Sequence, residues 1–209
     1  MRVEIVQELE SSDAKLEIPW ASVADPEVRY IDLKKFPEKI PRLEESRRFP
    51  SLGCLLRKIH AKGSGFRTAK CDAWTTTRLS ADERLDFNLP YKVGGYLDLV
   101  FARAKLNSRL EPHAQLGREL EQLLRPCRVQ AQVEIAVRRC LFHPKKRWGY
   151  YLTIFIHAYG ATRSEPKKEW SRAVGCLGDA LLQIGPTFGA LPHHRAPRKP
   201  RASDSRLDP

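Results

Sequence analysis

Four side chains that can carry acid–base chemistry occur in segments with the character of β-strands: Asp72, Asp98, Glu134 and His157. Carboxylates and an imidazole held within reach of one another can move protons to and from a substrate. If the fold brings these groups to one surface, they are the candidate catalytic residues of the chain.

The second pair of predicted strands decides whether Glu134 meets His157. Residues 129–142 and 150–159 alternate apolar and polar side chains, which is typical of strands with one buried face. A tight loop that pairs His143 with Trp148 would place Glu134 opposite His157. A slip of two residues would leave the two side chains as diagonal neighbours on the same face.

The first pair of predicted strands brings the other two carboxylates to the matching face. Residues 66–78 and 91–104 are extended segments joined by a polar loop. The face that matches Glu134 and His157 would carry these side chains: Lys70, Asp72, Tyr96, Asp98 and Val100.

Helical patterns lie between and around the two strand pairs, in residues 41–48, 51–62, 112–125 and 165–184. The order is helix, strand, strand, helix, strand, strand, helix. It predicts an α+β fold, in which two ββα units form a four-stranded antiparallel sheet with the helices packed on one face.

Two interpretations of the other face are open. It is either a concave acid–base site with aromatic walls, or a polar sheet face that water covers. Five of its side chains are too apolar for an open face: Tyr96, Val100, Tyr151, Phe155 and Tyr159. We therefore expect a cover, supplied by an N-terminal arm with Trp20 and Tyr30, by a second copy of the chain, or by a ligand.

The charge of the chain is strongly positive and unevenly distributed. The formal net charge is +12, whereas residues 1–27 hold seven acids and two bases, and residues 190–209 hold five bases and two acids. A basic body with an acidic arm favours a polyanionic partner, most often nucleic acid. The alternative is a solvated basic surface without a partner.

Nucleic-acid binding would use basic side chains for phosphates and tyrosine rings for bases. The candidates are three residues at the predicted hairpin tip and three on the neighbouring strands: Lys145, Lys146, Arg147, Arg138, Tyr151 and Tyr159. The alternative for the tip is an ordinary charged turn.

The five cysteines are odd in number and widely spread, which indicates reduced, buried thiols rather than a disulfide framework. Cys140 and His143 have C-x-x-H spacing, but no second pair completes the four ligands of a structural zinc site. We predict no metal and no cofactor, and interpret Cys140 as a core residue near the hairpin tip.

The chain is divided into a partly irregular N-terminal arm (1–36), an α+β domain (37–189) and a disordered basic tail (190–209). No run of 18 apolar residues is present, so we expect no membrane span. The acidic start of the sequence differs from a signal peptide, and we expect a cytoplasmic protein.

The element order resembles that of the LAGLIDADG homing endonucleases, whose saddle-shaped sheet lies on DNA. The resemblance covers topology alone: that family carries an acidic metal ligand at the end of a glycine-bearing helix, where residues 51–58 here end in Arg57 and Lys58. We predict a nucleic-acid-binding module. The alternatives are a small-molecule binder or hydrolase-type enzyme that uses the four acid–base groups, and an assembly protein that dimerises through the sheet face.

Overall fold

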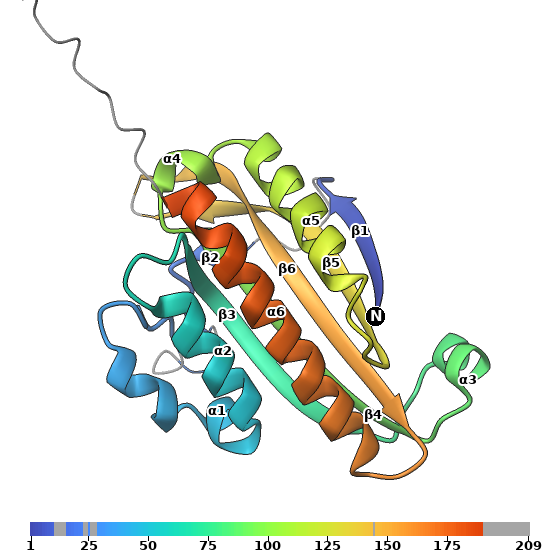
Figure 1. Cartoon of the computed structure of the whole chain (residues 1–209). Helices are drawn as coiled ribbons and strands as arrows, with labels where there is room; N and C mark the ends of the chain where they lie inside the picture. Colours follow the sequence, from blue (N-terminus) through green and yellow to red (C-terminus); the bar gives the residue numbers. More distant parts are fainter. Residues whose placement is uncertain (11–15, 23–24, 26–28, 144, 190–209) are drawn as a thin grey trace, which may run out of the picture.

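The computed structural model describes residues 1–10, 16–22, 25, 29–143 and 145–189 (Figure 1). Its elements, in chain order, are β1 (Arg2–Glu8), β2 (Leu16–Ile18), the 3-10 helix η1 (Pro37–Arg42), α1 (Glu44–Arg48), α2 (Pro50–His60), β3 (Phe66–Thr76), α3 (Ala81–Phe87), β4 (Tyr91–Phe101), α4 (Ala104–Asn107), α5 (Leu110–Leu124), β5 (Ala131–Phe142), β6 (Arg147–Gly160) and α6 (Glu165–Gly189). The predicted tail, 190–209, lies outside the described residues.

The strands form one six-stranded mixed sheet in the order β1-β5-β6-β4-β3, and β2 also pairs with β5. The four strands predicted from the sequence pair with one another in antiparallel fashion. Both β1 and β2 pair with β5 in parallel. The predicted four-stranded sheet is therefore part of a larger one, which is extended beyond β5 by two further strands from the segment predicted to be an arm.

The long helices α2, α5 and α6 cover one face of this sheet (Figure 1). Leu56, Leu120 and Leu177 from these helices are fully buried against Leu97 and Ile154 of the central strands. Removing these side chains from water is the main source of stability for such a layered fold. The opposite face of the sheet is called the open face below.

Helix α3 lies at one end of the open face, where a polar loop was expected. Its start is a capping box: the Ser80 hydroxyl accepts from the backbone N–H of Glu83 at 3.1 Å, and the Glu83 carboxylate accepts from the N–H of Ser80 at 2.9 Å. The spacing Ser-x-x-Glu is a helix-start signal in the sequence. The expectation that all helices pack on one face is therefore corrected for α3.

The N-terminal segment covers the other end of the open face. Ile18 packs in a small buried cluster with Val100, Cys140 and Tyr151. The Trp20 indole N–H donates to the carbonyl oxygen of Ala69 at 2.7 Å. The sequence left open whether the N-terminal arm, a second copy of the chain or a ligand covers the open face. At this end of the face it is the arm.

The structure also places the cysteines and the C-x-x-H pair. All five cysteines are free thiols, but the expectation that they are buried holds for Cys140 alone, because Cys54 is exposed and the other three are partly exposed. Cys140 is fully buried, and His143 lies with Nε2 2.9 Å from a carboxylate oxygen of Glu17. Among the residues described, no cluster of three metal-ligating side chains occurs, and no helix is both long and apolar enough to cross a membrane.

Candidate functional site

The four acid–base residues lie on the open face, but the hairpin register differs from the tight-loop expectation. Leu141 pairs with Trp148, so that Glu134 lies opposite Phe155 rather than opposite His157. Glu134 and His157 are diagonal neighbours, because a shift of two residues keeps each side chain on its face. The last pair of the hairpin is Phe142 with Arg147 rather than His143 with Trp148, so the turn begins one residue earlier and the register shifts by two.

The centre of the open face carries four rings, from Trp74, Tyr96, Phe155 and His157. The centroid of Tyr96 lies 6.4 Å from that of Trp74 and 6.2 Å from that of Phe155, and His157 lies 6.3 Å from Phe155. All four side chains are partly exposed. We call Trp74, Tyr96, Phe155 and His157 the aromatic row.

Gly94 makes room for Trp74 on the open face. A Cβ atom at Gly94 would lie 2.8 Å from the Trp74 ring, and one at Gly95 would lie 2.8 Å from Trp170 on the helical face. The two tryptophans thus enclose the backbone of β4 from both sides. Glycine within a strand signals such a close approach. Trp74 is two residues from Asp72 on the same strand, so alternation places both side chains on the open face, although Trp74 was not among the predicted site residues.

Asp98 is buried and belongs to a chain of hydrogen-bonded polar groups that extends to partly exposed side chains. It is 6% exposed, and the Thr153 hydroxyl donates to it at 2.7 Å. Arg138 donates to the same hydroxyl at 3.4 Å and to the Glu8 carboxylate at 2.7 Å. Burial raises the pKa of Asp98 to about 6, although the Thr153 hydrogen bond and the charges of Arg138 and Lys70 oppose the shift. These contacts hold β1, β5, β6 and β4 together.

The other three predicted catalytic groups are separate from one another. The Asp72 carboxylate accepts from the N–H of Ala73 at 2.7 Å. Burial, together with the positive charge of Lys92, lowers the pKa of His157 to about 4, so its ring is neutral at pH 7. Burial and the nearby charges of Glu8 and Glu4 raise the pKa of Glu134. Within the described part of the chain, no hydrogen bond joins any two of the four groups.

The predicted nucleic-acid ligands divide into exposed and covered residues. Lys145, Lys146 and Arg147 are exposed at the hairpin tip. Tyr151 and Tyr159 are each only 4% exposed. In this structure the arm packs on Tyr151, and the Phe87 ring stacks on Tyr159 at 3.8 Å. At the centre of the open face, the partly exposed rings are those of the aromatic row.

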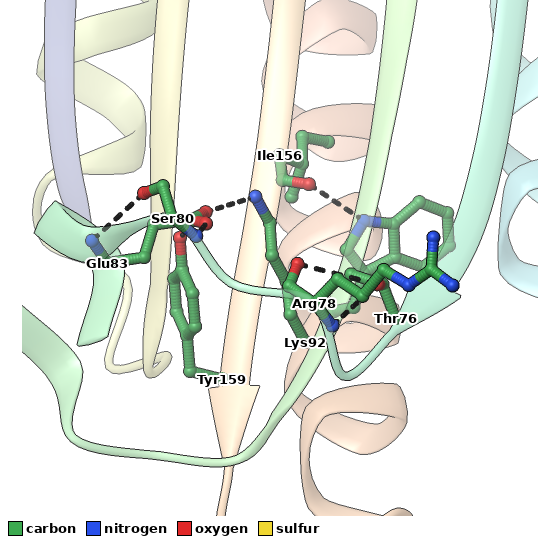
Figure 2. Close-up of polar contacts among 8 residues, drawn as sticks. Thr76, Arg78, Ser80, Glu83, Lys92, Ile156 and Tyr159 are labelled. Carbon is green, nitrogen blue, oxygen red and sulfur yellow. Dashed lines mark hydrogen bonds and ion pairs between the residues drawn. The ribbon is translucent and has the colours of Figure 1, made fainter.

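An ion pair fixes α3 over the end of β4 and β6 (Figure 2). The Glu83 carboxylate pairs with the ammonium group of Lys92 and accepts from the Tyr159 hydroxyl at 2.9 Å. Burial alone would raise the pKa of Glu83, but hydrogen bonds from Lys92, the Ser80 N–H and Tyr159 lower it to about 2. Both Lys92 and Tyr159 are thereby engaged in holding α3.

A cavity of about 420 Å³ lies beside this ion pair, where β3 ends and β4 and α6 begin. We call it the cationic cavity. Its lining residues, all within the described part of the chain, include four cations, three threonines and no carboxylate: Thr75, Thr76, Thr77, Arg78, Tyr91, Lys92, Val93, Arg163, Pro166 and Lys167. It was not foreseen, because its residues come from three distant segments.

The open face carries nearly equal numbers of acids and bases. Strand pairing places five acids and six bases on it: Glu4, Glu8, Asp72, Asp98, Glu134, Arg2, Arg67, Lys70, Lys92, Arg138 and Arg147. The face as a whole therefore offers a polyanion little net electrostatic attraction.

Comparison with protein-family models, with curated proteins and with solved structures finds no match for this chain.

Proposed function

We propose that the open face binds single-stranded nucleic acid, with bases stacked on the aromatic row. The observation that supports this most is a set of partly exposed rings, from Trp74, Tyr96 and Phe155, on three adjacent strands. Unpaired bases stack on aromatic side chains whatever their sequence. Sheets that carry aromatic side chains on one face are an established platform for two or three bases.

The carboxylates of the face suit bases better than phosphates. Asp72 pairs with Tyr96, and Glu134 pairs with Phe155. Each of these two rings therefore has a carboxylate side chain as its neighbour on the adjacent strand. A carboxylate accepts hydrogen bonds from exocyclic amino groups such as that of cytosine. The phosphates would follow the rim of the face, where exposed Lys70 lies.

The acid–base alternative receives less support from the same geometry. Catalysis by a general acid and base requires groups within hydrogen-bonding reach of the substrate and of one another. Asp98 is buried and hydrogen-bonded by Thr153, and His157 is surrounded by rings rather than by carboxylates. We therefore assign the open face to binding.

The test is fluorescence anisotropy with labelled ten-nucleotide single strands of DNA and RNA, titrated at several salt concentrations. Stacking on one ring contributes about 1–3 kcal/mol, so Tyr96→Ala and Phe155→Ala should each raise the Kd roughly 5- to 150-fold. Phe36→Ala is the matched control, because Phe36 is 45% exposed and lies just before η1.

The wild-type Kd should rise steeply with salt, because phosphate contacts release counterions. Thermal unfolding of each variant shows whether it retains the fold. Undetectable binding of both strands, or equal Kd values for wild type and the two row variants, would refute the proposal.

A further inference from the structure

The cationic cavity has the size and the lining of a ligand site. Its volume of about 420 Å³ lies within the roughly 300–1,000 Å³ typical of small-molecule sites. Threonine hydroxyls and basic side chains line it, and carboxylates are lacking among the lining residues. We propose that the cationic cavity binds a phosphate monoester.

The positive charges of the cavity are largely unbalanced. Lys92 is neutralised by Glu83. The other three cations, Arg78, Arg163 and Lys167, form no ion pair within the described part of the chain. Three such charges around one cavity repel each other until an anion joins them. A phosphate monoester carries about −1.5 to −2 at pH 7, more than the single charge of a backbone phosphate diester.

Helix α6 adds to the positive potential at the same place. It is 25 residues long and begins at the cavity, where Pro166 and Lys167 line the wall. The start of a long helix carries about half a positive charge. Glu165, the acid of the first turn, accepts hydrogen bonds from the N–H groups of Ala161 and Thr162 at 2.7 and 3.3 Å, so its charge is already engaged outside the cavity lining.

Packing fixes the start of α6 against the sheet. A Cβ atom at Gly160 would lie 2.5 Å from Cδ of Pro166, so the end of β6 touches the first turn of α6. The indole of Trp170 donates to the carbonyl oxygen of Ile156 at 3.1 Å. These contacts place Arg163 and Lys167 before any ligand arrives, which lowers the entropic cost of binding.

The turn that follows β3 positions Arg78. The Thr76 hydroxyl accepts from the backbone N–H of Arg78 at 2.9 Å. Figure 2 shows the Arg78 side chain extending away from this turn, with no hydrogen bond to the other residues drawn. Among the described residues, the hydrogen bonds of Arg78 involve its backbone only. Guanidinium groups match phosphate oxygens in a two-point geometry.

A phosphate monoester could come from a free mononucleotide or from the phosphorylated end of a nucleic acid strand. The inference concerns the shared chemistry and does not depend on the aromatic row. Two pairs of probes separate the sources. Adenosine 5′-monophosphate against adenosine, measured by calorimetry, tests the free ligand. A 5′-phosphorylated ten-nucleotide oligothymidylate against its 5′-hydroxyl form, measured by anisotropy, tests the strand end.

The decisive variant is Arg163→Gln/Lys167→Gln, in which both changes are at exposed positions. The matched control is Lys105→Gln/Arg109→Gln, which removes the same charge at and just after α4, at the opposite end of the sheet (Figure 1). Arg78→Gln removes a third cation of the cavity from a different segment. It replaces the double variant as the test if the double variant unfolds at a lower temperature than wild type.

In wild type and control, the phosphorylated member of at least one pair should bind at least tenfold more tightly than its partner. In Arg163→Gln/Lys167→Gln this preference should fall below twofold. A preference in the first pair assigns a free ligand, and a preference in the second pair alone assigns a strand end. The inference is overturned if neither pair shows a preference in wild type, or if the preference survives in the cavity variants. If Arg163→Gln/Lys167→Gln loses the preference for the phosphorylated probe but binds the 5′-hydroxyl strand as wild type does, the cavity and the aromatic row bind independently.

Discussion

The buried carboxylate of Asp98 makes the stability of the protein depend on pH in a defined direction. Its folded pKa of about 6 lies above the ordinary value of 3.8, chiefly because it is buried. A group of this kind stabilises the fold fully below its unfolded pKa, and that contribution is lost as the pH rises through the folded pKa. Since one pKa unit corresponds to about 1.4 kcal/mol, ionisation of Asp98 costs the folded state about 3 kcal/mol at pH 8.

The perturbation is Asp98→Asn, which is neutral at every pH and can still accept the hydrogen bond from Thr153. Its amide hydrogens need new acceptors, which costs about 1 kcal/mol. We therefore expect Asp98→Asn to be about 2 kcal/mol more stable than wild type at pH 8, and about equal or slightly less stable at pH 4.

Urea unfolding at pH 4, 6 and 8, followed by tryptophan fluorescence, measures these free energies. Asp86→Asn, at an exposed position of α3, is the control and should show no such dependence. The opposite result, a variant destabilised by more than about 1 kcal/mol at pH 8, would mean that attraction to Arg138 outweighs the cost of burying the charge. The reasoning from burial would then be wrong.

Two further predictions concern the ends and the centre of the open face. Glu83→Gln should lower the free energy of unfolding by about 1–2 kcal/mol at pH 7, because it weakens both the capping box and the pair with Lys92. Wild type should lose the same contribution as the pH falls from about 4.5 towards 2, since the pKa of Glu83 is lowered to about 2; urea unfolding at pH 7 and 3 measures it. Gly94→Ala brings a methyl group 2.8 Å from Trp74 and should destabilise by about 1–3 kcal/mol, whereas Gly175→Ala, where nothing lies within 4 Å, should stabilise by up to about 1 kcal/mol; chemical denaturation compares the two.

The placement of side chains on the open face could be predicted because strand alternation allows only two faces. Glu134 and His157 share a face in any register whose paired residue numbers have an odd sum, and a shift of two residues changes their separation but not their side. The register itself could not be predicted, because it depends on the residue at which the hairpin turn begins, and a turn of the same length can begin at His143 or one residue later. The separation of the two groups is therefore a result of the structure alone.

The outer strands and α3 show what alternation leaves undetermined. Residues 2–8 alternate like a strand, but a parallel partner is not adjacent in sequence, so pairing with β5 had no local signal. For α3 a signal was present, because Ser80 and Glu83 have capping-box spacing. Its position depends on the ion pair of Glu83 with Lys92 and on the hydrogen bond from Tyr159, which is distant in the sequence, and only the fold reveals the second contact.

The most direct test of the central proposal is ultraviolet crosslinking of the wild-type protein to a single-stranded oligonucleotide, with the crosslinked residues identified by mass spectrometry. Stacked bases lie in contact with the rings that hold them, so crosslinks should concentrate at Trp74, Tyr96 and Phe155. Crosslinks confined to the helical side of the sheet or to Trp148 at the hairpin tip, with none on the aromatic row, would contradict the proposal.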